Sequence, residues 1–135
     1  MDFKKIIVKA YVDVNPTEDP NKVRVAVEKV LGALPLKIVQ DGEKRRLIGK
    51  SEGSDALTRF HDLLRREQIL DAARKVLFKG IQGDTICFYL NKQVAYVGHI
   101  SFSQSVGESP LGPIHVEIES DNPRAVIDWL TPKTS

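Results

Sequence analysis

Hydrophobic side chains occupy every second position near the start of the chain. This alternation runs from Ile6 to Val14, as expected for a strand with one buried face. Asp19 is then placed as an N-cap, and Pro20 as the first residue of a helix. Apolar residues follow on one helical face until the sequence GALP at 32–35 ends the helix. The opening part of the chain therefore predicts a strand followed by a helix.

A hairpin and a long helical region come next. Two short strands flank Asp41-Gly42, a pair typical of two-residue turns, so residues 36–51 are predicted to form a β-hairpin. A helical pattern then extends over residues 54–79, but its apolar positions change phase near Glu67-Gln68. We interpret this change as two helices or as one bent helix.

Residues 85–90 have strand character at every position, and two structures are open for the residues that follow. If Asn91-Lys92 is a two-residue turn, the chain forms a second hairpin with apolar side chains opposite one another on both faces. The alternative is a short helix from Lys92 to Val97, with Asn91 as its N-cap. We favour the hairpin because its register is consistent along both strands.

A loop, a strand and a helix complete the chain. Residues 103–113 have the composition of a loop, residues 114–120 predict a last strand, and residues 122–130 predict a closing helix. We expect Glu117 and Glu119 to lie on the exposed face of an edge strand.

The predicted order of elements is β-α-β-β-α-α-β-β-β-α. Hairpins joined by helices, without regular βαβ alternation, predict an α+β fold in which an antiparallel or mixed sheet has helices packed on one face. No linker divides the sequence, so we expect residues 1–135 to form a single domain. The N-terminus resembles neither a signal peptide nor a membrane span, and the single cysteine cannot form an internal disulfide. Both features predict a cytoplasmic protein that does not associate with membranes.

The sequence contains no recognisable catalytic or metal-binding motif. Cys87 lies in an apolar strand with no neighbouring cation to activate it, so we interpret it as a buried core thiol. His61, His99 and His115 lack a second ligand at a spacing typical of zinc sites. We therefore predict no enzymatic activity, no metal and no cofactor.

Basic residues are concentrated in the middle of the chain. Residues 44–79 contain ten Lys and Arg against five Asp and Glu, whereas residues 80–135 contain three against six. Such a segment is suited to contact the phosphates of a polyanion, although helix residues three or four positions apart can also pair with one another. Stacking on RNA bases requires aromatic side chains on a face of the sheet that is open. The candidates for such a role are Phe88, Tyr89, Tyr96 and Phe102.

Three stretches of the sequence together resemble a known family. They are LLRREQILDAARKVL at 63–77, FYLNKQVAYVGHISF at 88–102 and SPLGPIHVEIES at 109–120. They are similar to the archaeal uncharacterised protein family 0201, whose members are described as RNA-binding proteins and as predicted exosome subunits. The resemblance implies a fold like that of the large-subunit ribosomal protein that binds 5S RNA. It also implies a homodimer and a place in an RNA-processing complex.

The resemblance also implies which side chains contact RNA. The residues at the matching motif positions are Arg65, Arg66, Arg74, Lys92 and Gln93. Charge alone adds Lys44, Arg45 and Arg46 beside the first hairpin turn. Val94 departs from the alanine that relatives tend to have after the glutamine, a change that a packed position tolerates.

Two functions are consistent with these patterns. The first is a non-catalytic RNA-binding protein that contacts phosphates through the basic segment 44–79 and the turn at 91–93. The second is a structural or assembly dimer with a protein partner and no direct RNA contact. In the second case the runs LNKQ at 90–93 and SPLGP at 109–113 build the fold and the dimer interface.

Overall fold

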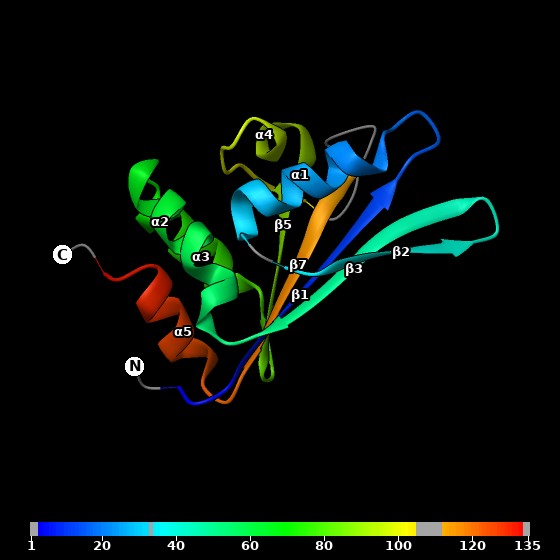
Figure 1. Ribbon diagram of the computed structural model, residues 1–135. Coiled ribbons are helices and arrows are strands. Elements are labelled where there is room, and N and C mark those ends of the chain that lie inside the picture. Colours follow the sequence, from blue (N-terminus) through cyan, green and yellow to red (C-terminus); the bar gives the residue numbers. More distant parts are fainter. Residues whose placement is uncertain (1–2, 33, 105–111, 134–135) are drawn as a thin grey trace.

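An antiparallel sheet forms one layer of the molecule, and the helices form the other (Figure 1). The computed structural model describes residues 3–32, 34–104 and 112–133. Within these residues the strands follow the order β2-β3-β1-β7-β5-β4, and β6 also pairs with β5. The strands are β1 (Ile6–Val14), β2 (Leu36–Asp41), β3 (Lys44–Glu52), β4 (Ile81–Gln82), β5 (Thr85–Asn91), β6 (Phe102–Ser103) and β7 (Pro113–Ser120). The predicted α+β class is confirmed.

The helices begin largely where the sequence places their caps. The Asp19 side chain accepts a hydrogen bond from the Asn21 backbone N–H at 2.9 Å, and Pro20 opens the first helix. The helical segments are α1 (Pro20–Leu31), the 3₁₀ helix η1 (Ser54–Leu57), α2 (Thr58–Arg66), α3 (Leu70–Lys79), α4 (Lys92–Tyr96) and α5 (Pro123–Leu130). In the described part of the chain, none of them has the length and apolar character needed to cross a membrane.

The long helical region is divided in two, which confirms the first of the two interpretations. α2 ends at Arg66, and α3 begins at Leu70. Between them Gln68 has a φ of 57°, in the left-handed region that residues other than glycine seldom adopt. This conformation changes the direction of the chain, which accounts for the change of phase in the apolar pattern.

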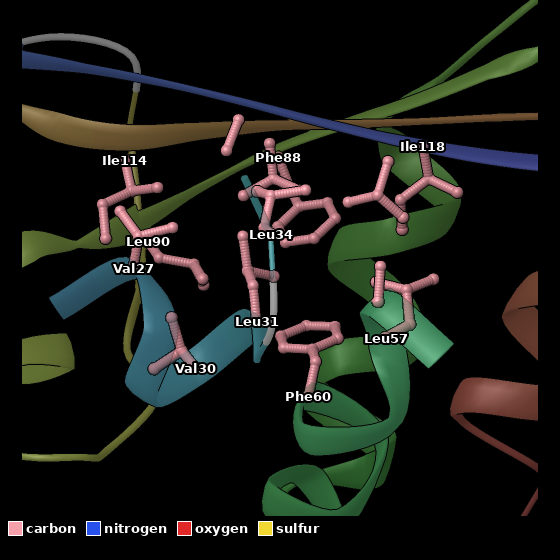
Figure 2. Close-up of a cluster of buried hydrophobic side chains, with 14 of the residues drawn as sticks. Val27, Val30, Leu31, Leu34, Leu57, Phe60, Phe88, Leu90, Ile114 and Ile118 are labelled. Carbon is pink, nitrogen blue, oxygen red and sulfur yellow. The ribbon is translucent and has the colours of Figure 1, made fainter. Parts of the chain in front are cut away.

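The hydrophobic core lies between the sheet and the helices (Figure 2). Val12 of β1 is opposite Leu47 of β3 on one side and Ile114 of β7 on the other, and all three side chains are buried. From the helix layer, Phe60 of α2 stacks on Phe88 of β5 with 5.3 Å between ring centroids. Burial of each such apolar side chain stabilises the fold by about 1.5 to 3 kcal/mol. The core thus fixes which face of the sheet the helices cover.

The predicted hairpin around Asn91-Lys92 is wrong, and the alternative short helix is correct. The Asn91 side chain accepts a hydrogen bond from the Val94 backbone N–H at 2.9 Å and so caps α4. β5 pairs along its length with β7 rather than with residues 93–97, which form most of α4, and α4 packs against α1. Apolar residues on both faces of β5 fit either partner, so the local pattern does not select one.

β7 is a central strand, which corrects the prediction of an edge strand. It lies between β1 and β5. Ile114, Val116 and Ile118 point into the core, whereas Glu117 and Glu119 are partly exposed on the opposite face. These glutamates reach solvent because no described helix covers that face, not because the strand lies at an edge.

Candidate nucleic-acid interface

The face of the sheet opposite the helices, which we call the open face, carries a row of three aromatic rings. Tyr11 of β1 is opposite His115 of β7, and His115 is opposite Tyr89 of β5. The centroid of the His115 ring lies 5.5 Å from that of Tyr11 and 4.7 Å from that of Tyr89. All three side chains are partly exposed. Strand alternation places them on one face, and strand pairing places them in one line.

The aromatic row borders a hollow of about 390 Å³. Arg46 and Asp13 line the same hollow, and the Arg46 Nε lies 3.1 Å from the Asp13 Oδ1. The two side chains are 54% and 66% exposed, so their ion pair is screened by water and contributes little to stability. The Arg46 guanidinium can therefore exchange its carboxylate for another anion at low cost. The hollow combines aromatic surface with an exchangeable cation.

Charge is unevenly distributed on the open face. Lys44, Arg46 and Lys50 point to the same side of β3, and all three are exposed. On β7 the outward side chains include Glu117 and Glu119. Glu119 is partly neutralised by Lys9, whose Nζ lies 3.6 Å from a carboxylate oxygen. The β3 side of the open face is therefore the basic side.

Among the residues predicted from charge alone, Arg45 lies apart from Lys44 and Arg46. It is opposite Val14, a core residue, so its side chain leaves β3 on the helix-covered face at the end of the sheet. The four aromatic candidates also separate. Phe88 and Phe102 belong to or pack against the core, and Tyr96 is exposed on α4. Of these four, Tyr89 is the one on the open face.

Two of the predicted helix arginines bind the C-terminal end of α5. The Arg65 guanidinium donates hydrogen bonds to the carbonyl oxygens of Leu130 at 3.1 Å and Trp129 at 3.2 Å. Arg74 donates to the Thr131 carbonyl oxygen at 2.7 Å. Helix ends leave carbonyl groups without partners within the helix, and arginine satisfies them with charge-assisted bonds. Arg65 and Arg74 thus hold α5 against α2 and α3.

Arg74 makes further contacts within the chain. Its Nη2 lies 2.7 Å from the Asp128 Oδ1, and its guanidinium carbon is 4.8 Å from the centroid of the Phe78 ring. Only 15% of the Arg74 side chain is exposed. Arg66, in the last turn of α2, is exposed, where a cation also interacts favourably with the helix dipole.

Lys92 is buried, with 3% of its surface exposed. Its Nζ donates to the Asp13 carbonyl oxygen at 2.8 Å and to the Glu18 Oε1 at 3.0 Å. Burial alone raises the pKa of Glu18, but hydrogen bonds from Asn15 and Lys92 outweigh it and lower the pKa. Lys92 therefore ties α4 to the end of β1 and to the turn before α1.

The four residues of the motif at 90–93 therefore have different roles. Leu90 is in the core, Asn91 caps α4, and Lys92 forms the buried pair. Gln93 is exposed and lines a cavity of about 350 Å³ together with residues of α1 and the turn before it. The predicted residues consequently do not form one surface: Lys44 and Arg46 lie on the open face, and the others lie elsewhere.

Tyr11 and His115 lie on the open face but are not among the RNA contacts predicted from the sequence. Period-two alternation already indicates that both point away from the core side of their strands. The alternation does not show whether a second layer covers that side, and it does not show that β1, β7 and β5 are neighbours.

The chain is similar to several proteins of archaea. Residues 7–120 match a family model described as RNA binding. A UPF0201 protein of Sulfurisphaera tokodaii is 50% identical over 131 residues, covering 97% of this chain and 89% of the relative. A UPF0201 protein of Metallosphaera sedula is 45% identical over 131 residues, covering 97% and 90%. The crystal structure of a UPF0201 protein from Methanococcus jannaschii matches with a TM-score of 0.84 and 34% identity, covering 96% of this chain and 95% of that one.

The structure is an α+β protein with a single antiparallel sheet in its described residues, and most of the chain matches the family model described as RNA binding. The chain belongs to the UPF0201 family. The resemblance seen in the three sequence stretches is therefore confirmed. The likeness to the 5S RNA-binding ribosomal protein, the homodimer and the RNA-processing complex stay predictions.

Proposed function

We propose that this chain binds RNA through the open face, with bases against the aromatic row and phosphates on the cations of β3. The observation that carries the proposal is the alignment of Tyr11, His115 and Tyr89 across three adjacent strands, without a covering helix in the described chain. Unpaired RNA bases stack on aromatic side chains, and each stacked base contributes about 1 to 3 kcal/mol. The family model described as RNA binding supports the same ligand class.

The basic side of the open face is suited to follow an RNA backbone. On β3, Arg46 follows Lys44 by two residues and Lys50 follows Arg46 by four, which places them about 7 Å and about 13 Å apart along the strand. Arg46 also lines the hollow beside Tyr11 and Tyr89, so a phosphate held by Arg46 leaves its base within reach of the rings. The proposal is a binding role without a catalytic step.

We also propose a division among the predicted RNA contacts. Lys44, Arg45, Arg46, Arg66 and Gln93 remain candidates for direct contact. Arg65, Arg74 and Lys92 already bond to carbonyl or carboxylate oxygens of the chain, and these bonds are lost if the cations turn to RNA. Their contribution to RNA binding is therefore expected to be indirect, through the fold.

The test is binding to single-stranded and structured RNA at two salt concentrations. Exchanging Lys44 and Lys50 together for alanine is expected to weaken binding and to lower the salt dependence by about one to two ions. The matched control exchanges Lys22 and Lys75, two exposed lysines of α1 and α3, for alanine. Equal losses in both double variants would exclude the open face as the site. No binding by the unmodified protein at low salt would exclude the function.

A second candidate, an assembly dimer, has its own supporting observation. β2 is an edge strand, and Ile38 and Val39 on it are 48% and 45% exposed. An exposed apolar edge is a template for pairing with another strand. The β2–β3 hairpin also projects away from the helices in Figure 1. Light scattering tests this candidate: Ile38→Lys is expected to convert a dimer to a monomer, and a monomeric unmodified protein would exclude it.

A further inference from the structure

Three metal-ligating side chains meet on the open face. The Cys87 sulfur, a ring nitrogen of His115 and a carboxylate oxygen of Glu117 all lie within 4.8 Å of one another. Cys87 is directly opposite Glu117 in the β5–β7 pair, and His115 precedes Glu117 by two residues on the same face. Directly opposed residues in a sheet have Cβ atoms about 5 Å apart, and this spacing brings short side chains together. The cluster is therefore a product of strand pairing.

The nitrogen that His115 directs into this cluster lacks a hydrogen bond. Among the described residues, its Nε2 is the buried side-chain polar atom for which no hydrogen-bond partner is found. The Glu117 Oε1 lies 3.5 Å from this nitrogen. The ring is held by Tyr89 on one side and Tyr11 on the other. A buried nitrogen without a partner is costly, and a bound cation satisfies it.

Glu117 supplies the oxygen donor of this cluster. A divalent ion bound there would displace the thiol proton of Cys87 to solvent and neutralise the carboxylate. Lys9 is opposite Glu117 across the β1–β7 pair, but its Nζ pairs with Glu119 at 3.6 Å. Glu117 is thus not committed to this lysine.

We propose that Cys87, His115 and Glu117 bind one Zn²⁺ ion. One sulfur, one nitrogen and one oxygen donor suit zinc rather than magnesium or calcium, which prefer oxygen ligands alone. In a tetrahedral site the donors are about 3.5 Å apart, so small side-chain rotations must close the wider separations. Three protein ligands leave a fourth position for water or another ligand, and Glu117 and His115 also line the hollow of the open face.

The proposal does not depend on RNA binding, because all three ligands are side chains of this chain. The first experiment titrates Zn²⁺ into reduced, metal-free protein in competition with a chromophoric chelator. The expected result is one ion per chain. Co²⁺ at the same site is expected to show the near-ultraviolet charge-transfer absorption of a thiolate ligand. Failure of the folded, reduced protein to compete for Zn²⁺, or a Co²⁺ complex without thiolate absorption, would overturn the proposal.

Paired variants locate the ion. Cys87→Ser and His115→Phe are expected to lower Zn²⁺ affinity at least tenfold. His61→Phe is the matched control, because His61 also stacks on an aromatic ring, that of Trp129 at 4.9 Å, but belongs to α2. Unchanged affinity in Cys87→Ser, or an equal loss in His61→Phe, would contradict the assignment.

A measurement on the unmodified protein covers the case in which a variant fails to fold. Alkylation of Cys87 by iodoacetamide is expected to slow at least tenfold when Zn²⁺ is added and to recover when EDTA removes it. Mg²⁺ at the same concentration serves as the control and is expected to give no protection. Equal alkylation rates with and without Zn²⁺ would refute coordination by Cys87.

Discussion

Arg46 and Arg74 are both arginines that pair with an aspartate, yet they lie in opposite environments. The Arg74 guanidinium contacts Asp128, the Thr131 carbonyl oxygen and the Phe78 ring, and 15% of the side chain is exposed. The Arg46 pair with Asp13 is 54% exposed on the arginine side and borders the open face. Equal charges in the sequence therefore differ in what they can bind: Arg74 is used by the fold, whereas Arg46 is accessible to a ligand.

Lys92 is more deeply buried than either arginine, with 3% of its surface exposed. Lys92→Met is expected to lower the free energy of unfolding by about 3 to 5 kcal/mol, because it leaves Glu18, whose side chain is only 12% exposed, without its cation. Denaturant unfolding measures the loss, with Lys22→Met at an exposed site as the control. The double variant Lys92→Met with Glu18→Gln is expected to recover part of the stability. A loss below about 1 kcal/mol in the single variant would contradict the structural role of the pair.

The next largest expected effect on stability comes from replacing one of the two arginines, Arg74, with alanine. Arg74→Ala is expected to cost about 1.5 to 3 kcal/mol, the range for hydrogen bonds to charged groups. Arg46→Ala is expected to change stability by less than about 0.5 kcal/mol, since exposed ion pairs contribute little. Thermal and denaturant unfolding of both variants measures the difference. Equal losses of stability in the two variants would contradict the conclusion that Arg74 stabilises the fold and Arg46 does not.

The buried pair also predicts how stability depends on pH. The pKa of Glu18 is lowered in the folded protein, since the hydrogen bonds from Asn15 and Lys92 outweigh the effect of burial. Such a carboxyl adds stability that is complete above its unfolded pKa and is lost as the pH falls through the lower, folded pKa. We expect this contribution to fade below about pH 4.5, the ordinary value for a glutamate. Glu18→Gln is expected to show a shallower loss over the same range; identical pH profiles would contradict the assignment.

The smallest expected effect is the one that concerns function most directly. Arg46→Ala is expected to reduce the salt dependence of RNA binding by about one ion while leaving the fold intact. Filter binding at several salt concentrations measures the slope. Arg66→Ala, on the helix side, distinguishes the open face from the helix candidates. A larger change in Arg66→Ala than in Arg46→Ala would move the proposed RNA site to α2.

The sequence by itself determined the local structure of several segments, although not that of residues 91–97. Alternation from Ile6 to Val14 defined β1 and its buried side, Asp19 and Pro20 defined the start of α1, and the phase change near Gln68 predicted the break between α2 and α3. These features depend on residues within a few positions of one another. The charge of Lys44 and Arg46 was likewise evident, although not their environment.

Only the tertiary structure decided which strands are neighbours and which face stays open. β5 pairs with β7, about thirty residues further along the chain, instead of folding back on itself at Asn91. That choice aligns Tyr89 with His115, places Cys87 opposite Glu117 and leaves Lys92 to be buried beside Glu18. Periodicity states which side of a strand is apolar, but it carries no information about the partner strand. Partners are selected by the packing of the whole core, and so are the sites that form between them.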